Sequence, residues 1–199
     1  ILTISYDFEA REESAKVFNN MLMSEKDFSI LILATEQVLS MEVDSMINQL
    51  NLLGNLVSVE IKPYSINQAN AQKITHKEYE DFIVKWVDSQ VPKRFQFINW
   101  DNIDAALELE YNAFSDNHVY ITPSGNFAVL EFDKEDKEYF LELGSFEAYN
   151  IWARKEKTQL SRICIECPYL GHCLTEHYRY VKDLTHSCSG YKGLLDYYA

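Results

Sequence analysis

The chain has 199 residues, of which 47% are hydrophobic and 25% charged, and this composition is ordinary for a soluble globular protein. Its net charge of −13 argues against a nucleic-acid partner and against anionic membrane surfaces, because both need clustered Lys and Arg. No apolar run could span a bilayer, and no basic segment followed by an apolar one opens the chain. We therefore expect no signal peptide and a cytoplasmic location.

Strand-like and helix-like patterns alternate from residue 1 to about residue 100. Strands are expected at residues 1–5, Phe28–Thr35, Asn55–Ser65 and Arg94–Asn99. The run Phe28–Thr35 is almost continuously apolar, which indicates a sheet covered on both faces, as is typical of parallel α/β architecture.

Helices are expected between these strands. Residues 11–23 form a weak candidate, and residues 40–54 carry an apolar stripe that ends at Gly54, where a C-terminal cap belongs. In the third helix, Thr75 and Glu78 form a capping box that precedes an aromatic stripe. The order β-α-β-α-β-α-β predicts right-handed crossovers and a parallel sheet.

The pattern changes after residue 115. The segment "HVYITPSGNFAVLEFD" predicts a β-hairpin around a Pro-Ser-Gly-Asn turn, and Glu138–Gly144 predicts a third strand. Ser145 is the expected cap of a following short helix. We therefore place a boundary near residue 112, which divides the chain into domains 1–112 and 113–199.

All the cysteines lie near the end of the chain, at Cys164, Cys167, Cys173 and Cys188, with the spacing C-x2-C-x5-C-x14-C. Disulfides suit small secreted domains, and unrelated buried thiols would not gather in one segment. The spacing therefore favours a four-thiolate metal centre, which suits Zn²⁺ or an iron–sulfur cluster. Only one C-x2-C pair is present, and the x5 gap points toward the larger cluster.

The segment "CIECPYLGHC" with its later cysteine resembles the C-terminal part of radical SAM enzymes that carry a SPASM domain. The resemblance implies that Cys164, Cys167, Cys173 and Cys188 hold an auxiliary [4Fe–4S] cluster. Gly125 matches the hairpin glycine of the family. The cysteines of the other auxiliary cluster are absent: Leu130 and His177 stand at two of their positions, and residues 109–115 contain none. The chain thus resembles a member with a single auxiliary cluster.

The same resemblance implies that residues 1–112 are the later βα units of a partial (β/α) barrel and that residues 113–199 are a SPASM-like module. The motif C-x3-C-x2-C, which holds the SAM-cleaving cluster in the family, is missing. The implied function is that of the C-terminal part of a peptide or protein maturase, with S-adenosylmethionine as a cofactor of the full-length enzyme. In it the auxiliary cluster would serve electron transfer or substrate binding.

The alternative is a non-catalytic peptide-binding module with a structural zinc or iron–sulfur site. Whether this chain is itself an enzyme stays open, as do its oligomeric state and the identity of its peptide or protein partner.

Polar residues at predicted strand ends are weaker candidates. Ser5, Asp7, Thr35 and Pro63 end three of the strands, where barrel folds place their chemistry, but such residues more often begin loops. His172, beside Cys173, is set aside as a metal ligand because four thiolates already complete a site, and the same argument applies to His177.

Overall fold

The computed structural model describes residues 2–8, 13–63, 74–110, 120–132, 138–156, 162–170, 172–173, 188 and 191–199. The chain divides into two compact units, the first taking in the described residues up to Asp104 and the second those from Ala105 onward. The predicted boundary near residue 112 lies outside the described residues. No helix within the described ranges is long and apolar enough to cross a membrane.

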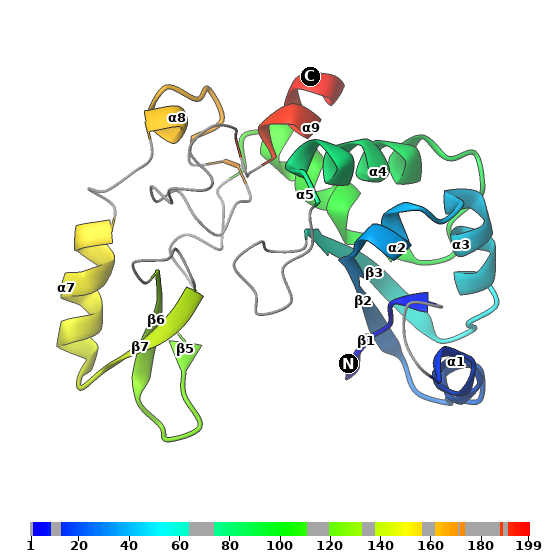
Figure 1. Ribbon diagram of the computed structural model, residues 1–199, viewed down its shortest axis with the longest axis horizontal. Coiled ribbons are helices and arrows are strands. Elements are labelled where there is room, and N and C mark those ends of the chain that lie inside the picture. Colours follow the sequence, from blue (N-terminus) through cyan, green and yellow to red (C-terminus); the bar gives the residue numbers. More distant parts are fainter. Residues whose placement is uncertain are drawn as a thin grey trace. The chain divides into compact units, whose positions relative to one another are not determined.

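The first unit contains a four-stranded parallel sheet in the order β1-β2-β3-β4, which Figure 1 displays in dark blue to green. The strands are β1 (Leu2–Ser5), β2 (Phe28–Ala34), β3 (Leu56–Pro63) and β4 (Gln96–Phe97). Every neighbouring pair is parallel, so the chain must cross back between strands through a helical connection. The predicted α/β class with a parallel sheet is confirmed.

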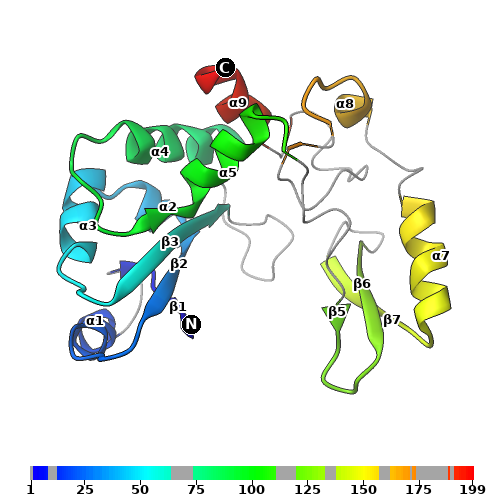
Figure 2. The same ribbon diagram turned by 180° about the vertical axis from the view of Figure 1, so that it is seen from behind.

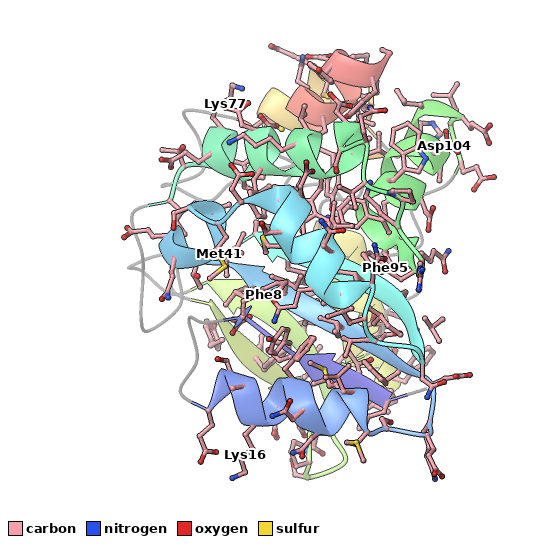
Figure 3. The ribbon with its side chains drawn as sticks, turned by 90° about the vertical axis from the view of Figure 1, so that its right-hand side faces the viewer. Phe8, Lys16, Met41, Lys77, Phe95 and Asp104 are labelled. Atoms are coloured by element: carbon pink, nitrogen blue, oxygen red, sulfur yellow. The ribbon has the colours of Figure 1, made fainter. Side chains whose placement is uncertain are left out.

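The helices of this unit are α1 (Ser14–Leu22), α2 (Glu36–Leu39), α3 (Val43–Leu50), α4 (His76–Asp88) and α5 (Ile98–Leu107). Figure 3 shows α1, α3 and α4 lying side by side on one face of the sheet. Burial along β2 alternates accordingly: Phe28, Ile30, Ile32 and Ala34 are buried, and the residues between them are only half-buried. The expectation that both faces of the sheet are covered stays a prediction for the second face, where Leu31 and Leu33 are half-buried.

Helix α3 has the predicted apolar stripe, and Val43, Met46, Ile47 and Leu50 are all buried. Its predicted end was wrong. The helix stops at Leu50. Asn51, whose backbone is in the right-handed helical conformation, occupies the C-terminal cap position. Asn51 also bonds to the next connection, donating from Nδ2 to the Pro92 carbonyl at 2.8 Å and accepting from the Arg94 N–H at 2.9 Å. A side chain that bonds across the chain, rather than a glycine in a left-handed conformation, therefore ends this helix.

Helix α4 begins with the predicted capping box. The Thr75 side chain accepts from the Glu78 N–H at 3.2 Å, and the Glu78 carboxylate accepts from the Thr75 N–H at 2.7 Å. Both bonds satisfy backbone donors that would otherwise lack a partner in the first helical turn. The stripe behind this cap is buried, through Tyr79, Phe82, Ile83 and Trp86.

Replacing Thr75 with alanine is expected to destabilise the first unit by about 1 kcal/mol, because the helix loses its N-cap acceptor. Replacement with serine retains the hydroxyl and should cost only a few tenths of that amount. Urea unfolding of the two variants measures the difference. Equal stability of the alanine and serine variants would contradict a role for the hydroxyl.

The sheet passes directly into α5 at Ile98, so the strand predicted over Arg94–Asn99 is shortened to Gln96 and Phe97. Strand β4 pairs with β3 only at Gln96 and Phe97. Two positions further along that register, Asn99 corresponds to Ile61 and is fully buried. Its side-chain amide accepts from the Ile61 N–H and donates to the Ile61 carbonyl, both at 2.8 Å. The amide thus continues the pairing of the sheet after the backbone has turned into a helix.

The second unit contains a three-stranded antiparallel sheet of β5 (Tyr120–Ile121), β6 (Phe127–Phe132) and β7 (Glu138–Leu143), visible in yellow-green in Figure 2. The predicted hairpin and third strand are confirmed. Gly125 has φ 82° at the turn, a conformation that glycine adopts without strain, and its N–H donates to the Thr122 carbonyl at 2.8 Å.

Three further helices belong to this unit: α7 (Phe146–Glu156), α8 (Arg162–Ile165) and α9 (Lys192–Tyr198). The Ser145 hydroxyl accepts from the Ala148 N–H at 3.1 Å, which confirms the predicted cap of α7. Phe146 and Tyr149 of α7 pack against Phe127 of β6, with ring centroids 5.5 and 6.2 Å away. Helix α7 therefore covers one face of the hairpin sheet.

Candidate metal centre

The first three cysteines lie on a tightly turned segment that starts in α8. The N–H of Cys167 donates to the carbonyl of Cys164 at 3.1 Å, which closes a turn between the two thiols of the C-x2-C pair. A second turn follows, in which Leu170 donates to Cys167 at 3.2 Å. A third bond, from Cys173 to the Tyr169 carbonyl at 2.8 Å, carries the chain to the third thiol. This segment, Cys164–Cys173, is called the cysteine loop below.

The fourth cysteine is tied to the loop through the residues that precede α9. The backbone N–H of Tyr191 donates to the Sγ of Cys173 at 3.3 Å, across 18 positions in the sequence. Cys188 stands three residues before Tyr191 in the sequence and, after burial, contributes to the raised pKa of Cys164. Backbone N–H donors to sulfur are favourable partners for a thiolate, because bonds to a charged acceptor are stronger than those to a neutral one.

The four thiols interact electrostatically. Burial, followed by the nearby thiols of Cys188, Cys173 and Cys167, raises the pKa of the Cys164 thiol from an ordinary 9.0 to about 11. All four cysteines are free, with no disulfide between them in this described part of the chain. In the metal-free protein Cys164 is therefore protonated at neutral pH, and a bound metal would be needed to hold it as a thiolate.

The thiols are near one another but not in the arrangement of a filled site. Among the described residues, no three Cys, His, Asp or Glu side chains converge closely enough to hold a metal ion. Charges interact over distances well beyond a coordination bond of about 2.3 Å. The other thiols can therefore raise the pKa of Cys164 without lying close enough to share a metal ion with it. The predicted convergence of all four sulfurs on one centre stays a prediction.

Three residues in or beside the loop were not found from the sequence. Lys192 and Asp196 form an ion pair on α9, and burial, followed by the Asp196 carboxylate, raises the pKa of the Tyr169 hydroxyl. The only signal in the sequence was the Lys-x3-Asp spacing, which places both side chains on one side of a helix. Nothing in the sequence connected that helix to Tyr169.

Of the two histidines near Cys173, only His172 lies among the described residues. The Nδ1 of His172 is 3.0 Å from the carbonyl oxygen of Glu110, a bond that ties the cysteine loop to the end of the segment after α5. His177, which stands at one of the missing cysteine positions, lies outside the described residues.

The polar strand ends of the first unit have local structural roles. The Asp7 carboxylate accepts from the Leu33 N–H at 3.1 Å, which joins the end of β1 to β2. Thr35 caps α2 by accepting from the Val38 N–H at 3.2 Å. Ser5 and Pro63 are exposed ends of their strands. The structure thus assigns Asp7 and Thr35 to the architecture of the sheet.

The sheet face opposite the helices is a second polar region, which sequence reasoning also missed. Ser29 and Ser58 share a hydrogen bond of 2.8 Å across β2 and β3. Glu60 and Lys62 alternate with buried residues along β3 and come within 4.0 Å of each other. The alternation in "VSVEIK" was the available signal for a face that is not sealed by apolar side chains.

Comparisons with protein-family models, curated proteins and solved structures found no match to this chain.

Proposed function

We propose that this chain is the C-terminal part of a radical SAM peptide or protein maturase of the SPASM type, and that its four cysteines bind one auxiliary [4Fe–4S] cluster. The observation that supports the proposal is the spacing C-x2-C-x5-C-x14-C, together with the turns that hold the first three cysteines on one loop. Three lie on consecutive turns of the cysteine loop, and the fourth precedes the residue whose N–H bonds to Cys173.

The residues fit such a cluster in their chemistry. Four free thiols supply the ligand set that iron–sulfur clusters use, and burial, followed by the other three thiols, raises the pKa of the Cys164 thiol. The Tyr191 N–H, which donates to the buried Cys173 sulfur, would stabilise a thiolate ligand there. When bound, the cluster would supply an electron acceptor or a point of attachment for the substrate peptide.

The architecture of the first unit agrees with the proposal at a coarser level. Its strands follow the sequence order, and α1, α3 and α4 lie on one face, whereas a doubly wound sheet carries helices on both. This arrangement is the one from which a partial (β/α) barrel is built. The half-buried face of β2 and β3, which carries both polar and apolar residues, would then line the inside of the barrel.

The chain would depend on another segment for SAM cleavage, because its sequence contains no C-x3-C-x2-C motif. All four cysteines are assigned to the auxiliary site, which leaves no thiol for a cluster with an open iron. S-Adenosylmethionine is accordingly proposed as a cofactor of the full-length enzyme, with a peptide or protein as its substrate.

The test is anaerobic reconstitution of this chain with iron and sulfide, followed by metal and sulfide analysis. We expect about four irons and four sulfides per chain, and serine at Cys188 should remove most of them. Alanine at Ile165, an exposed neighbour of Cys164, is the matched control and should load normally.

Zinc at about one ion per chain, with no iron retained, would contradict the cluster and favour the structural site of a peptide-binding module. Normal iron loading of the Cys188→Ser variant would contradict the assignment of the fourth ligand.

A further inference from the structure

The two cysteines of the C-x2-C pair are held on one tight turn. The N–H of Cys167 donates to the carbonyl of Cys164 at 3.1 Å. A turn closed by such a bond, whether helical or a β-turn, separates the Cα atoms of its first and fourth residues by about 5–7 Å. Disulfides join Cα atoms that are about 4.4–6.8 Å apart. The backbone separation of these two residues is therefore close to the one that a disulfide needs.

These two thiols are also the more accessible part of the cysteine loop. Cys164 and Cys167 are free and half-buried, and the two residues between them, Ile165 and Glu166, are exposed. Cys173 is only 6% exposed, and its sulfur already accepts a backbone N–H at 3.3 Å. A small oxidant in solution therefore reaches the C-x2-C pair more readily than the third thiol of the loop.

We propose that Cys164 and Cys167 form a redox modification site, at which a low-molecular-weight disulfide such as glutathione disulfide oxidises the metal-free chain to an internal disulfide. Formation of this bond does not depend on the proposed function, since two thiols suffice for it. Its consequence does rest on that function. The disulfide withdraws two of the four thiols assigned to the metal centre, so it blocks metal loading until the bond is reduced.

The reaction is two successive thiol–disulfide exchanges. The thiolate of one cysteine attacks a sulfur of glutathione disulfide, whose S–S bond breaks, so that a mixed disulfide forms and one glutathione leaves. The second cysteine then attacks the protein sulfur of the mixed disulfide, which closes the internal bond and releases the other glutathione. The two cysteines lose two electrons and two protons, and both are recovered in the two glutathione thiols.

Such a bond suits a reversible switch rather than a permanent cross-link. It closes a ring of only four residues, so it constrains the unfolded chain little and adds little stability. Exposed disulfides of low stability are the ones that thiol reductants open readily. Oxidation and reduction of the pair would therefore follow the ratio of glutathione disulfide to glutathione around the protein.

The experiment starts from the reduced, metal-free whole chain, which is incubated anaerobically with excess glutathione disulfide. Remaining thiols are alkylated in denaturant, and the bond is located by peptide mass spectrometry. We expect a disulfide between Cys164 and Cys167. Cys164→Ser leaves Cys167 without its partner, so that thiol should retain a glutathione instead. Cys173→Ser is the matched control, and its equilibrium constant for oxidation should equal that of the wild type to within about twofold.

A mapped bond from Cys164 or Cys167 to Cys188 would overturn the inference, as would glutathione adducts on the wild type without an internal bond. Oxidation in urea measures what the turn contributes. The equilibrium constant should fall there by at least about threefold, because the effective concentration set by the folded turn is lost. An equal or larger constant in urea would contradict the role of the turn.

Zinc binding tests the consequence for metal loading, because the same thiols bind zinc and because the sulfide used in cluster reconstitution would itself reduce the bond. The oxidised chain should bind zinc at least about tenfold more weakly than the reduced chain. Equal affinities would overturn the block on loading. Failure of the reduced chain to retain iron and sulfide would instead overturn the proposed function while leaving the mapped disulfide in place, so the two failures are distinguishable.

Discussion

Replacement of Cys167 by alanine is expected to open the metal-loaded second unit to proteases while the parallel sheet of the first unit stays folded. Among the residues after Gly144 whose side chains the structure describes, only Cys173, Leu194 and Leu195 are buried, which indicates little apolar core in that part of the segment. Metal ligation would supply the missing stabilisation, because ligand binding to a site that exists only in the folded state is folding free energy.

The size of the effect follows from local stability. A decrease of about 1.4 kcal/mol in the free energy of local opening increases the population of the opened segment tenfold. Removal of a cluster ligand should decrease that free energy by more than this amount. We therefore expect cleavage between Arg162 and α9 to accelerate by at least about tenfold in limited proteolysis read by mass spectrometry. Ile165→Ala, which changes an exposed neighbour, should be cleaved at the wild-type rate.

The first unit should resist the protease in both variants because its core is independent of the cysteines. Ile32, Ile47, Ile83 and Trp86 are all fully buried there. Equal acceleration of cleavage in both units would contradict the expectation that the stability of the first unit does not depend on the cysteines. Unchanged cleavage in Cys167→Ala, with the cluster verified in the wild type, would mean that the loop does not depend on its metal for order.

The parts of the fold that could be predicted from the sequence are those set by local chemistry. The capping box of Thr75 and Glu78 needs only residues three positions apart, and both of its bonds are present. The hairpin turn at Gly125 and the cap at Ser145 are local in the same sense. Short-range geometry is encoded by the residues that adopt it, so a sequence pattern predicts it directly.

What could not be predicted depends on contacts between distant residues. Asn51 replaces Gly54 as the end of α3 because its amide bonds to the segment at Pro92 and Arg94. The cysteine spacing predicted a metal centre, but the bond from Tyr191 to Cys173 depends on how α9 returns to the loop. Such long-range pairing leaves no periodic signal in one sequence.

The largest effect expected in the first unit is that of Asn99→Ala, which should destabilise it by about 2–4 kcal/mol. Asn99 is fully buried, and its amide makes three hydrogen bonds: two to the backbone of Ile61 and one, of 3.1 Å, to the Tyr79 hydroxyl. Alanine removes the acceptor of the Ile61 N–H in a place that water does not reach. An unpaired buried donor bears its full desolvation penalty, and the deleted amide also leaves a cavity.

Tyr79→Phe tests the contribution of the Tyr79 hydroxyl separately from that of the Asn99 amide. The Tyr79 hydroxyl donates to the Ile61 carbonyl at 2.9 Å, but that carbonyl still accepts from Asn99 when the hydroxyl is removed. The loss should therefore be about 1 kcal/mol, and the two changes should be non-additive because the groups share a partner. Asn20→Ala, at an exposed position of α1, is the matched control and should change stability by less than about 0.5 kcal/mol.

Urea unfolding gives the free energies, and hydrogen exchange of the Ile61 amide locates the change. Asn99→Ala should lose most of the protection at Ile61, whereas Tyr79→Phe should keep it, since only the asparagine accepts from that N–H. Protection at Ile61 that survives in Asn99→Ala would mean that another acceptor replaces the amide. In that case the extension of the sheet by a side chain would be incidental to stability, and the early turn of β4 into α5 would need a different cause.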